Sequence, residues 1–237
     1  MQTVVIIFSA ESEWRAAKKF LKVAFVETSP FGECFAILKG EQTLIYLQGG
    51  WGKIAAAASA QYAIIRWKPD LVINLGTCGG LQGQVDRGTV ILADRVLVYD
   101  LLEQMGNQQQ ALDYYTTVPD LSWLQEPYPQ AVQRGLMLSA DRDILPEQVA
   151  WLQETFGGVA ADWESASIAW VCDKNKVRCL ILREVTDLVS PMGGEAYQDI
   201  RVFHNAAQKA INNLMEHLPA WLDRVSKLET DIKNHNE

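Results

Sequence analysis

The chain has 237 residues, of which 49% are hydrophobic, and its formal net charge is -8. This length suits one α/β domain with a large buried core. The excess of acidic side chains argues against nucleic acid as a partner, because the average surface repels a polyanion. No stretch reaches the roughly 20 apolar residues of a membrane-spanning helix, and the apolar start of the chain is too short for a signal peptide. We therefore expect a cytoplasmic protein without a membrane partner.

Strands and helices are predicted to alternate along the chain. The predicted strands cover 4–8, 34–38, 43–48, 71–75, 90–98, 136–138 and 177–185. The predicted helices cover 14–21, 54–67, 147–156, 163–174 and about 196–222. The segment 100–134 has no clean period and is expected to form a loop with short helices. This order predicts a single α/β domain over 1–226, a three-layer αβα sandwich with a mixed, mostly parallel sheet, and a polar tail at 227–237.

Two glycine-rich segments follow predicted strands. The segment 49–53 (GGWGK) resembles a phosphate loop, but no glycine stands five positions before Gly52, and Ile54 replaces the Ser or Thr that would hold magnesium. A plain strand-to-helix turn is the preferred interpretation. The expected turn 76–80 (GTCGG) lacks the G-x-G-x-x-G order and predicts no dinucleotide cofactor. Its glycines could still let the backbone approach a ligand closely.

Histidine and cysteine chemistry finds little support in the sequence. The three histidines all lie after residue 203, and the four cysteines show no C-x-x-C spacing. We expect neither a metal nor an organic cofactor. Any catalysis should therefore depend on carboxylates.

Several acidic side chains follow predicted strands or begin predicted helices, namely Glu11, Glu13, Asp162, Glu164 and Asp187. For Glu11 and Asp162 the default interpretation is a solvated charge that the helix dipole favours. Several such positions converging on one sheet edge suit glycosidic cleavage. Its cation-like sugar needs nearby negative charge, a base for the attacking water and an acid for the leaving group.

Three segments carry a resemblance to a known family. They are 72–81 (VINLGTCGGL), 161–172 (ADWESASIAWVC) and 182–187 (LREVTD). Together they resemble the nucleoside phosphorylase and nucleosidase superfamily, and within it the 5′-methylthioadenosine/S-adenosylhomocysteine nucleosidases. The similarity is collinear from the first strand to the last helix. It implies a hydrolase that acts on a purine nucleoside with water as co-substrate.

The resemblance implies a role for each matching position. Glu13 matches the base that activates the attacking water, and Glu164 matches the carboxylate that binds the ribose hydroxyls. Asp187 matches the acid that protonates purine N7, so burial should raise its pKa while Glu13 stays ionised. Arg183 falls near the water and its base, and Thr77 falls beside that water.

Further positions are implied to contact the substrate, namely Gly79, Ile144, Thr186 and Tyr197, of which Tyr197 would line the pocket of the 5′ substituent. Two departures from the family pattern stand beside them. Trp163 replaces a methionine at the ribose face, and Asp143 replaces the phenylalanine that stacks on adenine. A lost stacking contact is worth about 1 kcal/mol, so glycosidic cleavage is a firmer expectation than adenine specificity.

Two other functions remain open from the sequence. A phosphate-dependent purine nucleoside phosphorylase would need a cation for phosphate, yet Asn74 stands where hexameric phosphorylases carry an arginine. Arg15 is the one nearby residue that could restore a phosphate site. A catalytically silent nucleoside-binding protein is the other alternative, and Trp163 and Asp143 support it. The resemblance also implies a homodimer in which the segment 101–105 completes the partner's pocket.

Overall fold

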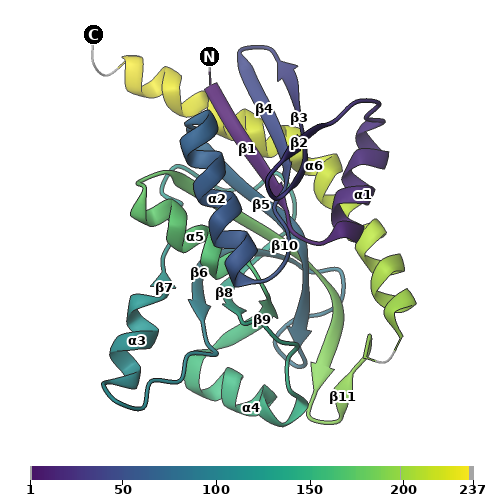
Figure 1. Ribbon diagram of the computed structural model, residues 1–237, viewed down its shortest axis with the longest axis vertical. Helices are drawn as coiled ribbons and strands as arrows, with labels where there is room; N and C mark the ends of the chain where they lie inside the picture. The colour runs from purple at the N-terminus through teal and green to yellow at the C-terminus, as the bar shows by residue number, and fades with distance from the viewer. Residues whose placement is uncertain (1, 198, 235–237) are drawn as a thin grey trace.

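The computed structural model describes residues 2–197 and 199–234, with side chains up to Val225 in the last helix. An eleven-stranded sheet lies at its centre (Figure 1). The strands are β1 (Gln2–Phe8), β2 (Glu27–Ser29), β3 (Gly32–Lys39), β4 (Gln42–Gln48), β5 (Leu71–Leu81), β6 (Val90–Val98), β7 (Thr116–Thr117), β8 (Gln133–Ser139), β9 (Gly158–Asp162), β10 (Arg178–Ser190) and β11 (Gly193–Gly194). The α-helices are α1 (Glu11–Leu21), α2 (Lys53–Trp67), α3 (Gln108–Tyr114), α4 (Val149–Trp151), α5 (Ser165–Lys174) and α6 (Ile200–Asn234).

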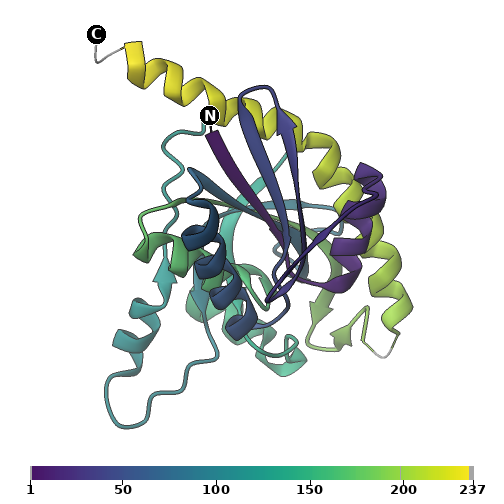
Figure 2. The ribbon, with the colours of Figure 1, turned by 45° about the horizontal axis from the view of Figure 1, so that its top comes forward.

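Helices cover both faces of the sheet (Figure 2). Helix α1 packs against α6, and α2 packs against α5. Strand β1 shows why both faces need cover, because its side chains alternate between two cores. Val4, Ile6 and Phe8 belong to the core that includes residues of α1 and α6, whereas Val5 and Ile7 belong to the core that includes residues of α2 and α5. The sequence of a strand that is buried on both faces is a continuous run of apolar residues.

The sheet is mixed and curls on itself. Strand β5 pairs in parallel with β1 and β10 and antiparallel with β9. Strand β10 also pairs with β6, and β6 leads through β8 to β9, so five strands close a ring. The predicted α/β class and mixed sheet are confirmed. The finer description, a mostly parallel three-layer sandwich, stays a prediction.

Some predicted elements differ from the structure. Residues 76–80 continue strand β5 instead of forming a turn, and strand β9 was not predicted. Helix α6 passes Leu222, where its end was predicted, and continues to Asn234. The predicted tail at 227–237 is therefore helical as far as it is described, and residues 235–237 lie outside the described part. No Gly or Pro after Leu222 interrupts the helix.

The irregular segment 100–134 holds the short helix α3 between long loops, as predicted, together with strand β7 and the first two residues of β8, which were not predicted there. The helix predicted over 147–156 is a succession of a 3-10 turn, one α-helical turn and a π-helical turn. In the part of the chain that the structure describes, no helix is both long and apolar enough to span a bilayer.

Candidate active site

Gly76 allows β5 and β10 to meet around a buried arginine. In the parallel register of these strands, Gly76 pairs with Arg183. A Cβ on Gly76 would collide with the Arg183 guanidinium and would lie 2.8 Å from Oε1 of Glu13. A glycine inside a strand often marks such a close approach. Its role here is to leave room for Arg183.

Arg183 lies among three carboxylates and is 1% exposed. Its Nε is 2.9 Å from Oδ2 of Asp162, its Nη2 is 3.5 Å from Oε2 of Glu164, and its Nη1 is 3.6 Å from Oε1 of Glu13. Nη2 also donates to Oδ1 of Asn74 over 2.7 Å. A buried charge is stable only when it is paired and hydrogen-bonded. One guanidinium therefore supports a cluster whose carboxylates outnumber it.

Asp162 is fully engaged in this cluster. Its carboxylate accepts hydrogen bonds from Ser139 Oγ over 2.6 Å and from the backbone amides of Glu164 and Ser165, each over 3.1 Å. These bonds satisfy free amides at the start of α5. The default interpretation of Asp162 as a solvated charge is wrong, because its side chain is buried and paired with Arg183.

Glu13 is held by four donors from two segments. Its Oε2 accepts from the backbone amides of Ser9 and Ala10, over 3.2 and 3.0 Å. Its Oε1 accepts from the amide and the hydroxyl of Thr77, over 2.7 and 2.8 Å. Ala10 stands at the N-cap of α1 without a side-chain oxygen, so Glu13 reaches back to satisfy free amides there. The same bonds fix the carboxylate against β5.

Glu164 is a buried carboxylate whose pKa is raised. Its Oε1 accepts from the backbone amide of Gly52 over 2.9 Å. Burial raises the pKa of Glu164 to about 8, and the charges of Asp162 and Glu13 add to this rise, whereas Arg183 and the Gly52 amide oppose it. The ionised form therefore depends on those two donors.

Replacing Glu164 with Gln should stabilise the fold at alkaline pH. The folded-state pKa of Glu164 is raised from 4.5 to about 8, so the native carboxyl contributes stability below 4.5 that is lost as the pH rises through 8. Gln has no such loss. The free energy of unfolding, measured in urea, should therefore become larger for Glu164→Gln relative to the wild type as the pH rises between these values. If Glu164→Gln is instead less stable than the wild type by the same amount at every pH, Glu164 is ionised throughout, and Arg183 and the Gly52 amide offset the cost of burying its charge.

Asp187 reaches the site through a bulge in β10. The register of β10 on β5 shifts between Val185 and Asp187, and both Thr186 and Asp187 line the cavity described below. Such a bulge re-aims side chains. Burial raises the pKa of Asp187, and the negative charges of Glu195 and Asp143 raise it further, against the hydrogen bond that Thr186 donates over 2.8 Å. This is the direction that a proton-donating carboxyl needs.

A cavity of about 680 Å³ joins these groups. Ten of the predicted site residues line it, namely Glu13, Thr77, Gly79, Asp143, Ile144, Trp163, Glu164, Thr186, Asp187 and Tyr197. Arg183 does not line the cavity and lies behind the carboxylates. It contacts the predicted base, Glu13, from that side, and its place near the attacking water stays a prediction. The structure thus brings together residues that are far apart in the chain, from strands and helices across the whole sequence.

Sequence reasoning missed several lining residues, namely Ala10, Trp51, Arg142, Asp162, Ile200 and Phe203. Trp51 lies in the segment interpreted as a plain turn, and its ring stacks on Trp163 with centroids 5.5 Å apart. Ile200 and Phe203 fit the helical core pattern of α6, but they lie at its start and face the cavity. Periodicity alone cannot separate a core position from a pocket wall.

Tyr197 and Ile144 meet at another part of the cavity wall. The Tyr197 hydroxyl donates to the backbone carbonyl of Ile144 over 2.5 Å. Asp143, next in sequence, is exposed, yet its charge still raises the pKa values of Asp187 and Tyr197. Asp143 therefore lies near enough to influence the acid at Asp187.

Neither residue considered for phosphate binding offers a cation to the cavity. Asn74 is fully buried, where its amide donates to the Ile7 carbonyl over 3.0 Å and its oxygen accepts from Arg183. Arg15 has a side chain that is 74% exposed and pairs with Glu11 over 2.7 Å. Among the lining residues that the structure describes, Arg142 is the one basic side chain. Among the described side chains, no group of three or more potential ligands is placed to hold a metal ion.

The fold and the cavity define a class of α/β protein with a carboxylate-lined pocket for a small molecule. The model of the phosphorylase superfamily matches residues 3–220. The chain therefore belongs to the phosphorylase superfamily, and the resemblance of its three sequence segments is confirmed.

Two relatives and one solved structure illustrate this membership. The chain is 26% identical over 204 residues to the 5′-methylthioadenosine/S-adenosylhomocysteine nucleosidase of Tolumonas auensis, covering 78% of this chain and 88% of the relative. It is 29% identical over 201 residues to that of Staphylococcus aureus, covering 78% and 85%. The crystal structure of the Helicobacter pylori nucleosidase with butyl-thio-DADMe-Immucillin-A has a TM-score of 0.79 at 18% identity, covering 94% and 98%. That structure shows the likeness of fold.

Proposed function

We propose that this protein hydrolyses the N-glycosidic bond of 5′-methylthioadenosine, S-adenosylhomocysteine or a related purine nucleoside. The observation that carries the proposal is the placement of Glu13, Glu164 and Asp187 around one cavity, with the pKa of Asp187 raised. The curated relatives named above are nucleosidases for these two compounds. The reaction needs a base, a sugar-binding carboxylate and an acid.

The proposed reaction uses each carboxyl group once. Asp187 gives its proton to purine N7, so that the C1′–N9 bond breaks with its electron pair moving to a neutral base. Glu164 accepts hydrogen bonds from the ribose hydroxyls and stabilises the cation-like sugar. Glu13 takes a proton from water as the water oxygen bonds to C1′. Exchange with solvent then returns a proton to Asp187 and removes one from Glu13.

Water suits this site better than phosphate. A phosphate dianion would meet carboxylates at Glu13, Asp162 and Glu164, whose buried counter-charge, that of Arg183, is already shared among them. Phosphorylases need strong charge-assisted hydrogen bonds to hold their anionic nucleophile. The buried Asn74 and the exposed Arg15 do not supply them. We therefore place hydrolysis ahead of phosphorolysis.

One assay tests the proposed function. Purified protein is incubated with 5′-methylthioadenosine, S-adenosylhomocysteine, adenosine or inosine, each with and without phosphate, and base and sugar products are separated. Free base with a reducing sugar, formed without phosphate, is the expected result. Ribose 1-phosphate formed only with phosphate would indicate a phosphorylase instead. Tight binding without release of base would indicate a silent nucleoside-binding protein.

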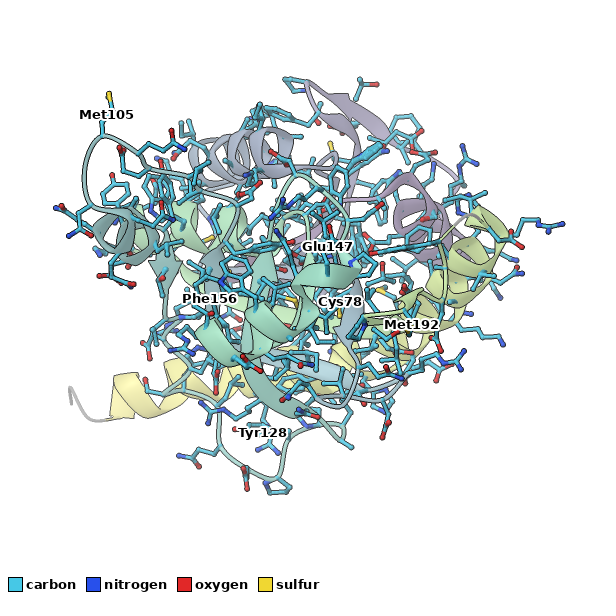
Figure 3. The ribbon with its side chains drawn as sticks, turned by 90° about the horizontal axis from the view of Figure 1, so that it is seen from below. Cys78, Met105, Tyr128, Glu147, Phe156 and Met192 are labelled. Atoms are coloured by element: carbon cyan, nitrogen blue, oxygen red, sulfur yellow. The ribbon has the colours of Figure 1, made fainter. Side chains whose placement is uncertain are left out.

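We further propose a cytoplasmic homodimer formed through the outer face of α2 and the loop before α3. Ile54 on α2 and Met105 in that loop are 85% and 99% exposed, and Met105 points away from the body of the molecule (Figure 3). Lys53 contacts Asp100, so the two segments adjoin. Large exposed apolar groups mark interaction surfaces.

The dimer has a direct test in solution. Light scattering should give twice the 26.5 kDa of one chain, and Ile54→Glu should lower this mass towards the monomer, because a buried unpaired charge opposes association. Phe25→Glu is the matched control, since Phe25 is 76% exposed in the connection between α1 and β2. A monomeric wild-type chain would contradict the proposal.

A further inference from the structure

Three consecutive residues, the last two of the loop between β4 and α2 and the first of α2, contact distant segments of the chain. Trp51 stacks on Trp163 at an interplanar angle of 29°. The amide of Gly52 donates to Oε1 of Glu164 over 2.9 Å. Lys53 donates its backbone amide to Oδ1 of Asp141 over 2.6 Å. The loop therefore links the Trp163–Glu164 segment to Asp141, which follows strand β8.

Helix α2 lacks a cap of its own, and Asp141 provides one from another part of the chain. The N-cap residue of α2 is Gly52, at φ 84° and ψ 160°, and it has no side chain to accept a hydrogen bond. No acidic residue stands in the first turn of α2. The Asp141 carboxylate takes the first amide of the helix and places a negative charge at the positive end of its dipole.

Charged groups fix Asp141 in this place. The Lys53 ammonium contacts the Asp100 carboxylate and lies 3.7 Å from Oδ2 of Asp141. Asp141 donates its own amide to Oδ2 of Asp100 over 3.1 Å. Asp100 follows strand β6, so this small network ties together the chain after β4, β6 and β8. The conformation of Gly52 is set by this network on one side and by Glu164 on the other.

We propose that Asp141 is a positioning residue, which through Lys53 holds the Gly52 amide on the carboxylate of Glu164. The proposal rests on the proposed function, in which that carboxylate binds the ribose hydroxyls. Of the two described donors to Glu164, the Gly52 amide is nearer, at 2.9 Å against 3.5 Å for Arg183. Asp141 does not itself line the cavity, yet it thus orients Glu164, which does.

The charges that face Glu164 make this amide important. Arg183 of β10 is the one described cation beside Glu164, while Asp162 of β9 and Glu13 of α1 repel its negative charge. Arg183 is shared with both of those carboxylates. Loss of the Gly52 amide should therefore make Glu164 harder to ionise. Ribose binding that needs the carboxylate would then begin at a higher pH.

The test compares Asp141→Ala with Asp141→Asn and with a control. Asn keeps an oxygen that can accept the Lys53 amide, whereas Ala removes it. Asp70→Ala is the matched control, because Asp70 is exposed and accepts a backbone amide, from Thr3 over 2.8 Å, at the far end of β1. Steady-state hydrolysis of 5′-methylthioadenosine is measured from acid to alkaline pH for all four proteins, together with their midpoints of thermal unfolding.

Asp141→Ala should lower kcat/KM about tenfold, mainly through KM, as for loss of one hydrogen bond to a charged group. The acid limb of its pH profile of kcat/KM should move to higher pH. Asp141→Asn should recover most of the wild-type kcat/KM and most of the wild-type position of that limb. A purely structural role would lower the unfolding midpoint, as in Asp70→Ala, without moving KM or the limb. An unchanged limb and KM in Asp141→Ala, or equal losses in Asn and Ala, would overturn the proposal. Wild-type protein that releases no base would instead contradict the proposed function.

Discussion

Replacing Asp187 with Asn is expected to lower kcat about a thousandfold, within the range for removal of a general acid, with a much smaller change in KM. Asn has nearly the same shape and can still donate a hydrogen bond, but it has no acidic proton to give to purine N7. The leaving group would then depart as an anion. Single-turnover release of base from 5′-methylthioadenosine measures the effect on the chemical step.

The pH profile separates this role from simple binding. The pKa of Asp187 is raised by burial and by the charges of Glu195 and Asp143, so kcat should fall as the pH rises through that raised value. Glu195→Gln removes one of these charges and should move the alkaline limb to lower pH while the plateau is kept. The limb should be absent from the residual activity of Asp187→Asn. If Asp187→Asn kept the wild-type kcat, the proton donor would be a group other than Asp187.

The sequence predicted which residues line the cavity better than it predicted the local structure that holds them. The segment 76–80 was expected to be a turn because glycines usually interrupt strands. Gly76 instead stays in β5 and makes room for Arg183, which comes from a strand more than a hundred residues later. No local pattern reports a contact over that distance. The resemblance to a family placed Thr77 and Gly79 at the cavity wall without it.

Other features were missed because they depend on contacts between residues that are far apart in the sequence. Asp162 looks like a helix-start charge, and it does accept amides at the start of α5, but the fold also buries it against Arg183. In the sequence Trp51 looks like an isolated aromatic residue, whereas in the structure its ring stacks on that of Trp163. Both depend on contacts with segments that lie elsewhere in the sequence. The strand-to-helix turn at 49–53 was correctly located, and only its partners could not be foreseen.

Replacing Arg183 with Met is expected to lower the free energy of unfolding by about 3–5 kcal/mol near neutral pH, the cost of leaving buried charges without their partner. Arg183 contacts the carboxylates of Glu13, Asp162 and Glu164 and is 1% exposed. Met has a similar length and no charge, so loss of packing should be small. Urea unfolding followed by circular dichroism measures the loss.

The charge origin of this loss predicts its dependence on pH. Burial raises the pKa of Glu164 and the Arg183 charge opposes that rise, so without the guanidinium the pKa of Glu164 should rise further in the folded state. The folded variant then binds protons that the unfolded chain releases, so its deficit should shrink as the pH falls towards about 4. Arg178→Met, at the start of the same strand, is the control and should lose little at any pH. A deficit for Arg183→Met that does not change with pH would attribute the loss to packing, and the carboxylates would then be stable without their shared counter-charge.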